Sequence, residues 1–213
     1  MLYDVVIFDL DGTLIDSSEG IINAAKRTIS ELGFQEMSCD EIKACIGPPI
    51  GESIVKRNGY GEAELKRFNS VFRELYKNEH LMEAKSYPGM IELLEDMGRY
   101  AFVSIATNKR IDYTTTLLER MGISEMCDEI QALDMEGRLK KKDLVENCIK
   151  ASGINDRERI VVIGDTDTDA MAAKECGVGF IGVTFGFGFK ERSDVTYGHA
   201  ADDARSLRDL LFG

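Results

Sequence analysis

The chain has 213 residues, of which 44% are hydrophobic, and its formal net charge at pH 7 is −12. The length fits one domain, or one domain that carries a smaller inserted one. The acidic balance argues against nucleic acid as a partner because no basic patch could displace phosphate counterions, and no apolar run reaches the roughly 18 residues that a membrane helix needs.

Short apolar runs alternate with helical patterns along most of the chain. The runs are apolar throughout, which is typical of parallel strands buried on both faces, and they cover residues 5–8, 101–106, 160–164 and 178–183, with a shorter candidate at 129–133. Helical spacing covers 88–98, 112–122, 142–153 and 168–177, and each segment closes on Gly. This alternation predicts an α/β fold with a doubly wound, Rossmann-like parallel sheet.

Residues 17–85 break the alternation, because they hold helical patterns without a convincing strand. We therefore expect an α/β core domain made of residues 1–16 and 86–213, with a helical subdomain, residues 17–85, inserted after the first strand. The segment Gly47-Pro48-Pro49 inside the insertion is either a loop that faces the substrate or a rigid turn between helices.

Three predicted strands end in polar residues. In chain order these are Asp9, Asp11 and Gly12, then Thr107, Asn108 and Lys109, and then Asp165 and Asp169. The carboxyl ends of parallel strands line the ligand crevice of an open α/β sheet. We therefore expect these side chains to lie close together.

Several carboxylates at one sheet edge need a positive charge. Asp9 and Asp11 share a face of an extended segment, and like charges that close repel each other. With Asp165 and Asp169, up to four negative charges would meet in one crevice. Oxygen ligands that leave room for water favour Mg²⁺, and a basic run, Lys140 to Lys142, could add a lysine. The sequence predicts a magnesium site.

Each of these features also has a purely structural explanation. An acidic strand end can be a solvated turn, Thr107 and Asn108 can cap a helix, and a lysine run can be a solvated face. The acids at 165–169 resemble a calcium loop, but Ala170 stands where that loop needs Gly. The G-F-G-F run at 186–189 lacks the third Gly of a dinucleotide loop. The joint arrangement favours a functional site.

Four segments, in this order, resemble the motifs of the haloacid dehalogenase superfamily: F-D-L-D-G-T at 8–13, T-N at 107–108, the lysine run at 140–142 and G-D-T-D-T-D at 164–169. The helical insertion resembles the C1-type cap of that superfamily. Three further segments are similar to its phosphoglycolate phosphatase-like branch, at 46–53, 87–94 and 182–188. The acid at Asp11 implies a phosphatase, because the dehalogenases of this superfamily lack an acid there.

The resemblance implies a Mg²⁺-dependent phosphatase of small organic phosphate monoesters, with a small phosphorylated metabolite as its substrate. Asp9 would attack phosphorus to give an aspartyl-phosphate, and Asp11 would protonate the leaving alkoxide and then activate water. The Mg²⁺ ligands would be Asp9, the backbone carbonyl of Asp11, Asp165 and, directly or in the surrounding shell, Asp169.

The phosphoryl group itself would be held by Thr107, Asn108 and backbone amides near Gly12. A lysine would neutralise charge on its oxygens. Relatives often have K-P-x-P where this chain has L-K-K-K-D-L, so the catalytic lysine is ambiguous. Similar sequences that read K-x-D-[VL] favour Lys141, with Lys140 and Lys142 as alternatives.

Other functions stay open at this point: a β-phosphoglucomutase-like transferase, a pyrophosphatase or 5′-nucleotidase, and a non-enzymatic phosphate-binding module. A mutase needs a second phosphate site, and Lys43, Lys56 and Arg57 form no basic cluster by helical spacing. Five cysteines without a C-x-x-C pair, and no secretory signal pattern, lead us to expect a cytoplasmic protein. A monomer and a homodimer are both compatible with the sequence.

Overall fold

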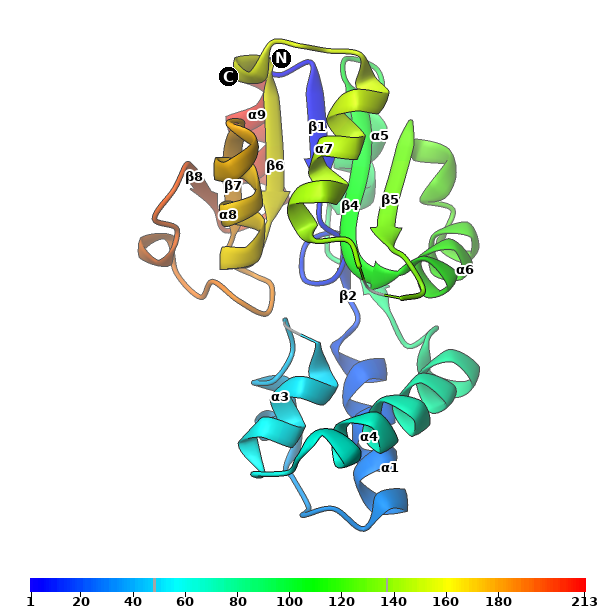
Figure 1. Ribbon diagram of the computed structural model, residues 1–213. Helices are drawn as coiled ribbons and strands as arrows, with labels where there is room; N and C mark the ends of the chain where they lie inside the picture. The colour runs from blue at the N-terminus through cyan, green and yellow to red at the C-terminus, as the bar shows by residue number, and fades with distance from the viewer. Residues whose placement is uncertain (48, 137) are drawn as a thin grey trace. The chain divides into compact units, whose positions relative to one another are not determined.

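The computed structural model describes residues 1–47, 49–136 and 138–213. It divides into an α/β unit, Met1–Ile15 with Ser86–Gly213, and a helical unit, Asp16–Lys85 (Figure 1). Pro48, in the turn that the sequence singled out, lies outside the described residues. Within the described ranges, no helix combines the length and the apolar character needed to cross a membrane.

The α/β unit is built on a six-stranded sheet in which every neighbouring pair of strands is parallel. Its strand order is β5-β4-β1-β6-β7-β8. The strands are β1 (Val5–Phe8), β4 (Phe102–Arg110), β5 (Glu129–Leu133), β6 (Ile160–Gly164), β7 (Gly179–Val183) and β8 (His199–Ala201). All residues of β1 and β6 are buried, as expected for central strands covered on both faces. The predicted α/β class is confirmed.

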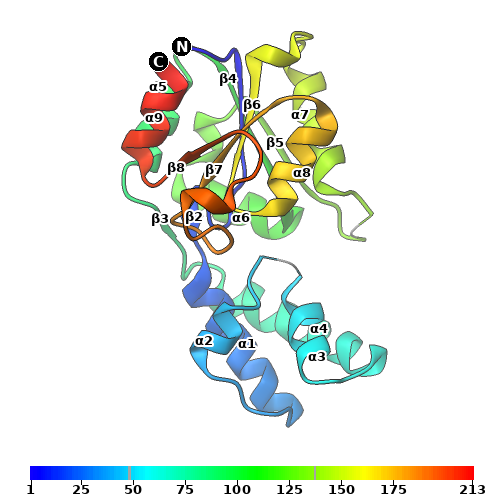
Figure 2. The same cartoon turned by 90° about the vertical axis from the view of Figure 1, so that its left-hand side faces the viewer.

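Helices cover both faces of this sheet. Helices α7 (Lys141–Ser152) and α8 (Asp167–Cys176) lie on one face, and α5 (Met90–Met97) and α9 (Ala204–Phe212) lie on the other (Figure 2). Helix α6 (Ile111–Met121) packs against β4 and β5. Helices α6, α7 and α8 end, as predicted, on glycines in the left-handed conformation, namely Gly122, Gly153 and Gly177.

The order of the strands reverses at β1. From β1 the chain fills β4 and β5 on one side, and then returns to fill β6, β7 and β8 on the other. Ligands of open α/β sheets bind at the carboxyl ends of the strands beside such a reversal. Asp9 and Asp165 directly follow the carboxyl ends of β1 and β6. The topology therefore brings these two acids to the edge where a ligand would bind.

The helical unit contains α1 (Ser18–Leu32), α2 (Cys39–Lys43), α3 (Ile50–Arg57), α4 (Glu62–Leu75) and a π-helical turn (Tyr76–His80). Stacked rings lie inside it, with centroids 5.5 Å apart for Phe72 and Tyr76 and 5.8 Å apart for Phe68 and Phe72. Two short strands, β2 (Ile15–Asp16) and β3 (Lys85–Ser86), pair where the chain leaves and re-enters the α/β unit.

Two expectations about the elements are wrong. The strand expected at 101–106 continues to Arg110, so Thr107 and Asn108 lie within β4 and not beyond its end. The N-cap of α6 is consequently Arg110, and the alternative in which Thr107 and Asn108 cap a helix fails. The sequence analysis also missed α9 and β8. The three residues H-A-A of β8 include none of the β-branched residues, Phe, Tyr or Trp that are enriched in strands.

Candidate active site

Asp9 occupies the centre of the site. It is the first residue after β1, and its N–H donates to the carbonyl of Ile163 at 2.8 Å, which extends the pairing of β1 with β6 by one residue. Its carboxylate is buried and contacts the Nζ of Lys141, the first residue of α7. The same Nζ lies 2.7 Å from Oδ1 of Asp169. One lysine therefore connects two buried carboxylates.

Burial determines how these groups ionise. It raises the pKa of Asp9 well above its usual range; the charge of Lys141 opposes this shift, and the charges of Asp169 and Asp165 add to it. Burial lowers the pKa of Lys141, but the charges of Asp169 and Asp9 outweigh burial, and the pKa ends above its usual range. Lys141 is therefore an ammonium at neutral pH and provides a fixed positive charge beside Asp9.

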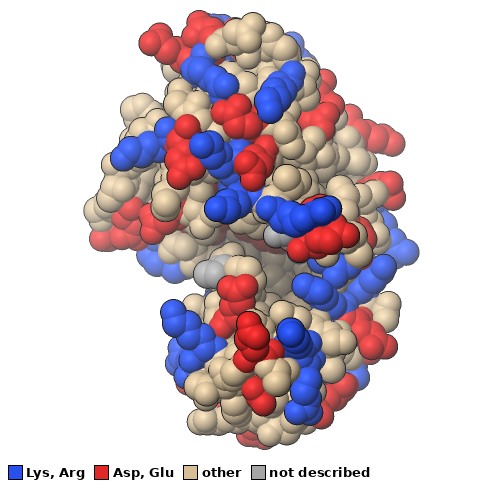
Figure 3. Space-filling view, viewed as in Figure 1, with Lys and Arg blue, Asp and Glu red and all other residues tan. Residues whose placement is uncertain are grey.

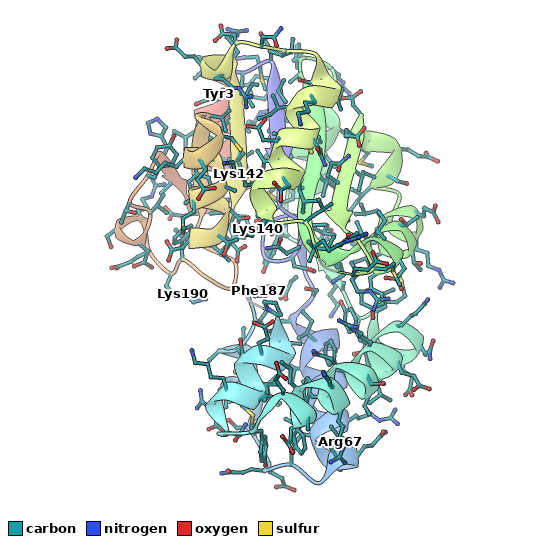
Figure 4. The ribbon with its side chains drawn as sticks, in the orientation of Figure 1. Tyr3, Arg67, Lys140, Lys142, Phe187 and Lys190 are labelled. Atoms are coloured by element: carbon teal, nitrogen blue, oxygen red, sulfur yellow. The ribbon has the colours of Figure 1, made fainter. Side chains whose placement is uncertain are left out.

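The structure separates the three adjacent lysines. The Lys141 side chain is 3% exposed, whereas that of Lys142 is 46% exposed and lies 3.7 Å from Glu175. Lys140 is the exposed N-cap residue of α7. Figure 4 labels Lys140 and Lys142 at this end of the helix. Of the three, Lys141 is the one that contacts Asp9.

Asp165 is held by the glycine-rich loop after β7. Its Oδ2 accepts hydrogen bonds from the N–H groups of Phe187 at 2.6 Å and Gly188 at 3.2 Å. Lys190 supports the loop, because its Nζ donates to the carbonyls of Gly186 at 3.1 Å and Phe187 at 2.7 Å (Figure 4). A Cβ at Gly186 would overlap the side chain of Asp165, so this close approach requires glycine.

Asp165 keeps one oxygen unused. Its Oδ1 is buried and has no hydrogen-bond partner among the described residues. Burial, with the charge of Asp169, raises its pKa to about 6, although the N–H donors of Phe187 and Gly188 act in the opposite direction. Gly12, which has a φ of 90°, approaches so closely that a Cβ there would meet the Asp165 carboxylate. A ligand is therefore expected at Oδ1.

Asp9, Asp165 and Asp169 form a group that could hold a metal ion. One carboxylate oxygen from each lies within 4.8 Å of the others, and all three residues are buried. Asp169 is oriented by Thr166, whose N–H and hydroxyl donate to its Oδ2 at 3.1 Å and 2.6 Å. Three carboxylates and no softer ligand fit a hard cation such as Mg²⁺ better than a metal that prefers thiolate or imidazole ligands, such as Zn²⁺.

The carboxylate of Asp11 is not part of this three-acid group. It is 23% exposed, and both of its oxygens lie 3.0 Å from Nζ of Lys109. The sequence analysis did not include Lys109 among the site residues. A signal was present, because Lys109 lies two residues after Thr107 and so shares its face in a strand.

The three residues expected to hold phosphate differ in exposure. Thr107 is 1% exposed, and its hydroxyl accepts the N–H of Lys109 at 3.1 Å. Asn108 is exposed. Gly12 lies against Asp165, as described above, and its N–H donates to the carbonyl of Ile15 at 2.8 Å. Thr107 is therefore close to the charged groups of the site, and Asn108 faces solvent.

The surface around the site is mixed in charge. In the view of Figure 3, Lys and Arg side chains alternate with Asp and Glu over the α/β unit, and the described residues show no large area of one sign.

A doubly wound sheet with buried acids and a buried lysine at its carboxyl edge is typical of an α/β enzyme. Comparison with known proteins identifies the family. The family model described as "Haloacid dehalogenase-like hydrolase" matches residues 6–183. The chain belongs to this family, as the sequence motifs predicted.

Relatives and solved structures agree with this assignment. A 5′-nucleotidase from Pseudomonas aeruginosa is 29% identical over 98% of this chain and 96% of its own length. A phosphoglycolate phosphatase from Aquifex aeolicus is 30% identical over 81% of each chain. A haloacid dehalogenase-like family hydrolase from Streptococcus pneumoniae has a TM-score of 0.89 and 27% identity over 98% of each chain. These likenesses confirm the predicted phosphoglycolate phosphatase-like branch.

Proposed function

We propose that the protein is a Mg²⁺-dependent phosphatase that hydrolyses small organic phosphate monoesters through an aspartyl-phosphate on Asp9. The observation that carries this proposal is the position of Asp9, which contacts the buried ammonium of Lys141 and belongs to the acid group with Asp165 and Asp169. Carboxylates alone would repel a phosphate dianion. A fixed cation and a metal ion beside Asp9 remove that repulsion.

The residues present fit a magnesium ion. Asp9, Asp165 and Asp169 offer oxygen atoms only, and the unpartnered Oδ1 of Asp165 is an available ligand atom. These three side chains, with the backbone carbonyl of Asp11, would hold the metal. When bound, Mg²⁺ would neutralise charge on the phosphoryl oxygens.

The first chemical step transfers the phosphoryl group to the enzyme. An oxygen of Asp9 attacks phosphorus, the bond from phosphorus to the leaving oxygen breaks, and Asp11 gives its proton to that oxygen. The alcohol leaves, and Asp9 carries the phosphoryl group. Lys141 stabilises the negative charge on the phosphoryl oxygens during the transfer.

The second step restores the enzyme. A water molecule attacks phosphorus, and the bond from phosphorus to Asp9 breaks. Asp11, now a carboxylate, accepts the proton that the water loses. Inorganic phosphate leaves, Asp9 is again a free carboxylate, and Asp11 again carries a proton.

Binding of the phosphoryl group is assigned to Thr107, Asn108 and the backbone near Gly12, and specificity is assigned to the helical unit. The buried hydroxyl of Thr107 supports the first assignment. The assignment of specificity is supported by the position of the helical unit in the chain. Asp16–Lys85 is inserted between β1 and β4 as a separate compact unit, so its sequence can change without altering the residues at the strand ends. The helical unit thus acts as a cap.

The leaving group distinguishes the candidate activities. The P. aeruginosa relative is named a 5′-nucleotidase, and the A. aeolicus relative a phosphoglycolate phosphatase. Both names describe hydrolysis of a phosphate monoester, so the roles proposed here for the strand-end residues apply to either activity. The mutase alternative is less well supported, because Arg57, one of the three cations of the helical unit considered for a second phosphate, pairs with Glu41 at 3.1 Å.

Hydrolysis of p-nitrophenyl phosphate with and without a chelator tests the proposal. We expect turnover to require Mg²⁺, to stop in excess EDTA and to return when Mg²⁺ is restored, with Ca²⁺ as an inhibitor because its looser coordination misplaces Asp9. Undiminished turnover in excess EDTA would contradict the metal assignment.

A panel of phosphoglycolate, nucleoside 5′-monophosphates and hexose phosphates then identifies the leaving group. Release of phosphate should equal the loss of substrate, without a bisphosphorylated activator. Isomerisation of a hexose 1-phosphate faster than phosphate release would instead support the mutase.

A further inference from the structure

We infer that Lys109 is a positioning residue for Asp11, and that its buried ammonium holds the Asp11 carboxylate in the orientation that proton transfer requires. The inference rests on the proposed function, in which Asp11 exchanges a proton with the leaving group and with water. It extends that function to a residue outside the four motifs that identified the family.

The contact between the two side chains is symmetric. The Nζ of Lys109 lies 3.0 Å from Oδ1 and 3.0 Å from Oδ2 of Asp11. The side chain of Lys109 is 5% exposed and that of Asp11 is 23% exposed. A buried ammonium needs hydrogen-bond partners, and Asp11 can accept from it both as a carboxylate and, through its carbonyl oxygen, as the protonated acid. The contact therefore persists while the proton moves, and it fixes the orientation of the carboxyl group.

The backbone of Lys109 is itself fixed. Its N–H donates to the hydroxyl of Thr107 at 3.1 Å, and its carbonyl accepts the hydroxyl of Thr114 at 3.4 Å. The pairing of β4 with β5 shifts register between Thr107 and Arg110, an irregularity of the kind that redirects a side chain at the end of a strand. Lys109 is therefore the rigid partner, and it constrains Asp11.

The two buried lysines of the site serve different carboxylates. Lys141, from α7, contacts Asp9 and Asp169, while Lys109, from β4, contacts Asp11. One cation thus lies beside the proposed nucleophile and the other beside the proposed proton donor. Loss of Lys109 should affect proton transfer and leave the attack of Asp9 intact.

Leaving groups of different basicity separate these two effects. The ratio kcat/KM reports the steps up to cleavage of the phosphorus–oxygen bond, and an alkoxide needs a proton at that point, whereas 2,4-dinitrophenolate does not. For Lys109→Met we expect kcat/KM to fall about 10- to 100-fold with glycerol 2-phosphate, and by less than about 3-fold with 2,4-dinitrophenyl phosphate.

Matched variants are measured in parallel. Lys142→Met removes an exposed lysine of the α/β unit that pairs with Glu175, and it should leave both substrates unchanged. Lys109→Arg keeps the cation. With glycerol 2-phosphate it should lose less activity than Lys109→Met, and with 2,4-dinitrophenyl phosphate the two variants should be alike. It also provides the test if Lys109→Met does not fold.

The outcomes distinguish this inference from the proposed function. Asp11→Asn should show the same selective loss on the alkyl substrate. If Asp11→Asn is selective and the Lys109 variants lose activity equally on both substrates, the positioning role is wrong. If Asp11→Asn itself loses activity equally on both substrates, the role of Asp11 in the proposed function is wrong.

Discussion

The two units of the molecule place their charges differently. Among the described residues of the α/β unit, five charged side chains are buried, namely Asp9, Lys109, Lys141, Asp165 and Asp169. In the helical unit, the described buried polar residues carry hydroxyls only: Ser17, Ser18 and Thr28. The ion pair between Arg57 and Glu41 of the helical unit is exposed, at 47% and 45% of the two side chains.

This difference indicates where the chemistry takes place. Burying a charge costs free energy, which well-packed apolar residues in the same place would avoid. The α/β unit bears this cost at the carboxyl ends of β1, β4 and β6, whereas the helical unit stabilises itself with an apolar core and exposed charges. Substitutions of charged residues in the two units should therefore have different consequences: loss of activity for the buried charges of the first, and small changes of stability for the exposed charges of the second.

The largest expected effect comes from Asp9→Asn. Loss of a nucleophile removes the covalent route, so kcat for p-nitrophenyl phosphate should fall by at least about 10³-fold. The fold should persist, because the substitution removes one carboxylate from a crowded group. Circular dichroism checks the fold and steady-state kinetics the activity. A variant that keeps more than about a hundredth of wild-type kcat would rule out attack by Asp9.

Lys141→Met should have the next largest effect. A fixed cation against the transferring group is worth about 10²- to 10³-fold in kcat, and Lys142→Met is the matched control because its side chain is 46% exposed. Without Lys141, Asp9 and Asp169 lose their buried partner, so the melting temperature of the metal-free protein should fall as well. Equal, small losses in both variants would contradict the role of Lys141.

Magnesium should stabilise the protein more at pH 7.5 than at pH 5. The pKa of Asp165 is raised to about 6, so its proton stabilises the metal-free fold at low pH, and that stability is lost as the pH rises through 6. Above pH 6 the ionised acids repel each other in the metal-free protein, and Mg²⁺ relieves this repulsion when it binds. Below pH 6 protons compete with Mg²⁺ for the same carboxylates.

Melting temperatures with and without Mg²⁺ at the two pH values check this prediction. The increase on adding metal should be larger at pH 7.5 in the wild-type protein. It should be small at both pH values in Asp165→Asn, which lacks a proposed ligand. An increase that is equal at both pH values in the wild type would contradict the link between Asp165 and the metal.

The smallest expected effect lies in the helical unit. Arg57→Ala removes an exposed ion pair with Glu41, and such pairs contribute about 0.2–1 kcal/mol. The free energy of unfolding, measured by urea denaturation, should therefore change by less than about 1 kcal/mol. A change of several kcal/mol would show that the helical unit also depends on its charges, and the contrast between the units would not hold.

Much of the fold and part of the site could be predicted from local patterns. Continuous apolar runs set the bounds of β1 and β6, because strands covered on both faces contain few polar residues. Asp9 and Asp165 then follow from the rule that ligands bind at the carboxyl ends of such strands. These inferences need only the neighbours of each residue in the chain.

The remaining residues depend on details that local patterns do not contain. Which of three adjacent lysines faces the acids depends on the residue at which α7 begins, and helix ends are uncertain by one or two residues. Lys109 was placed at a strand end but was given no role, because the expected strand stopped at residue 106 and β4 continues to Arg110. The support of Asp165 by the N–H groups of Phe187 and Gly188 joins segments about 20 residues apart, and a G-F-G-F sequence alone does not indicate it.

Detection of the covalent intermediate tests the central claim most directly. Enzyme mixed rapidly with p-nitrophenyl phosphate and Mg²⁺, and then quenched in acid, should show the added mass of one phosphoryl group on the peptide that contains Asp9. The same peptide from Asp9→Asn should show none. Substrate turnover by the wild-type enzyme with no phosphoryl group on this peptide at any quench time, or with one on another residue, would contradict the account.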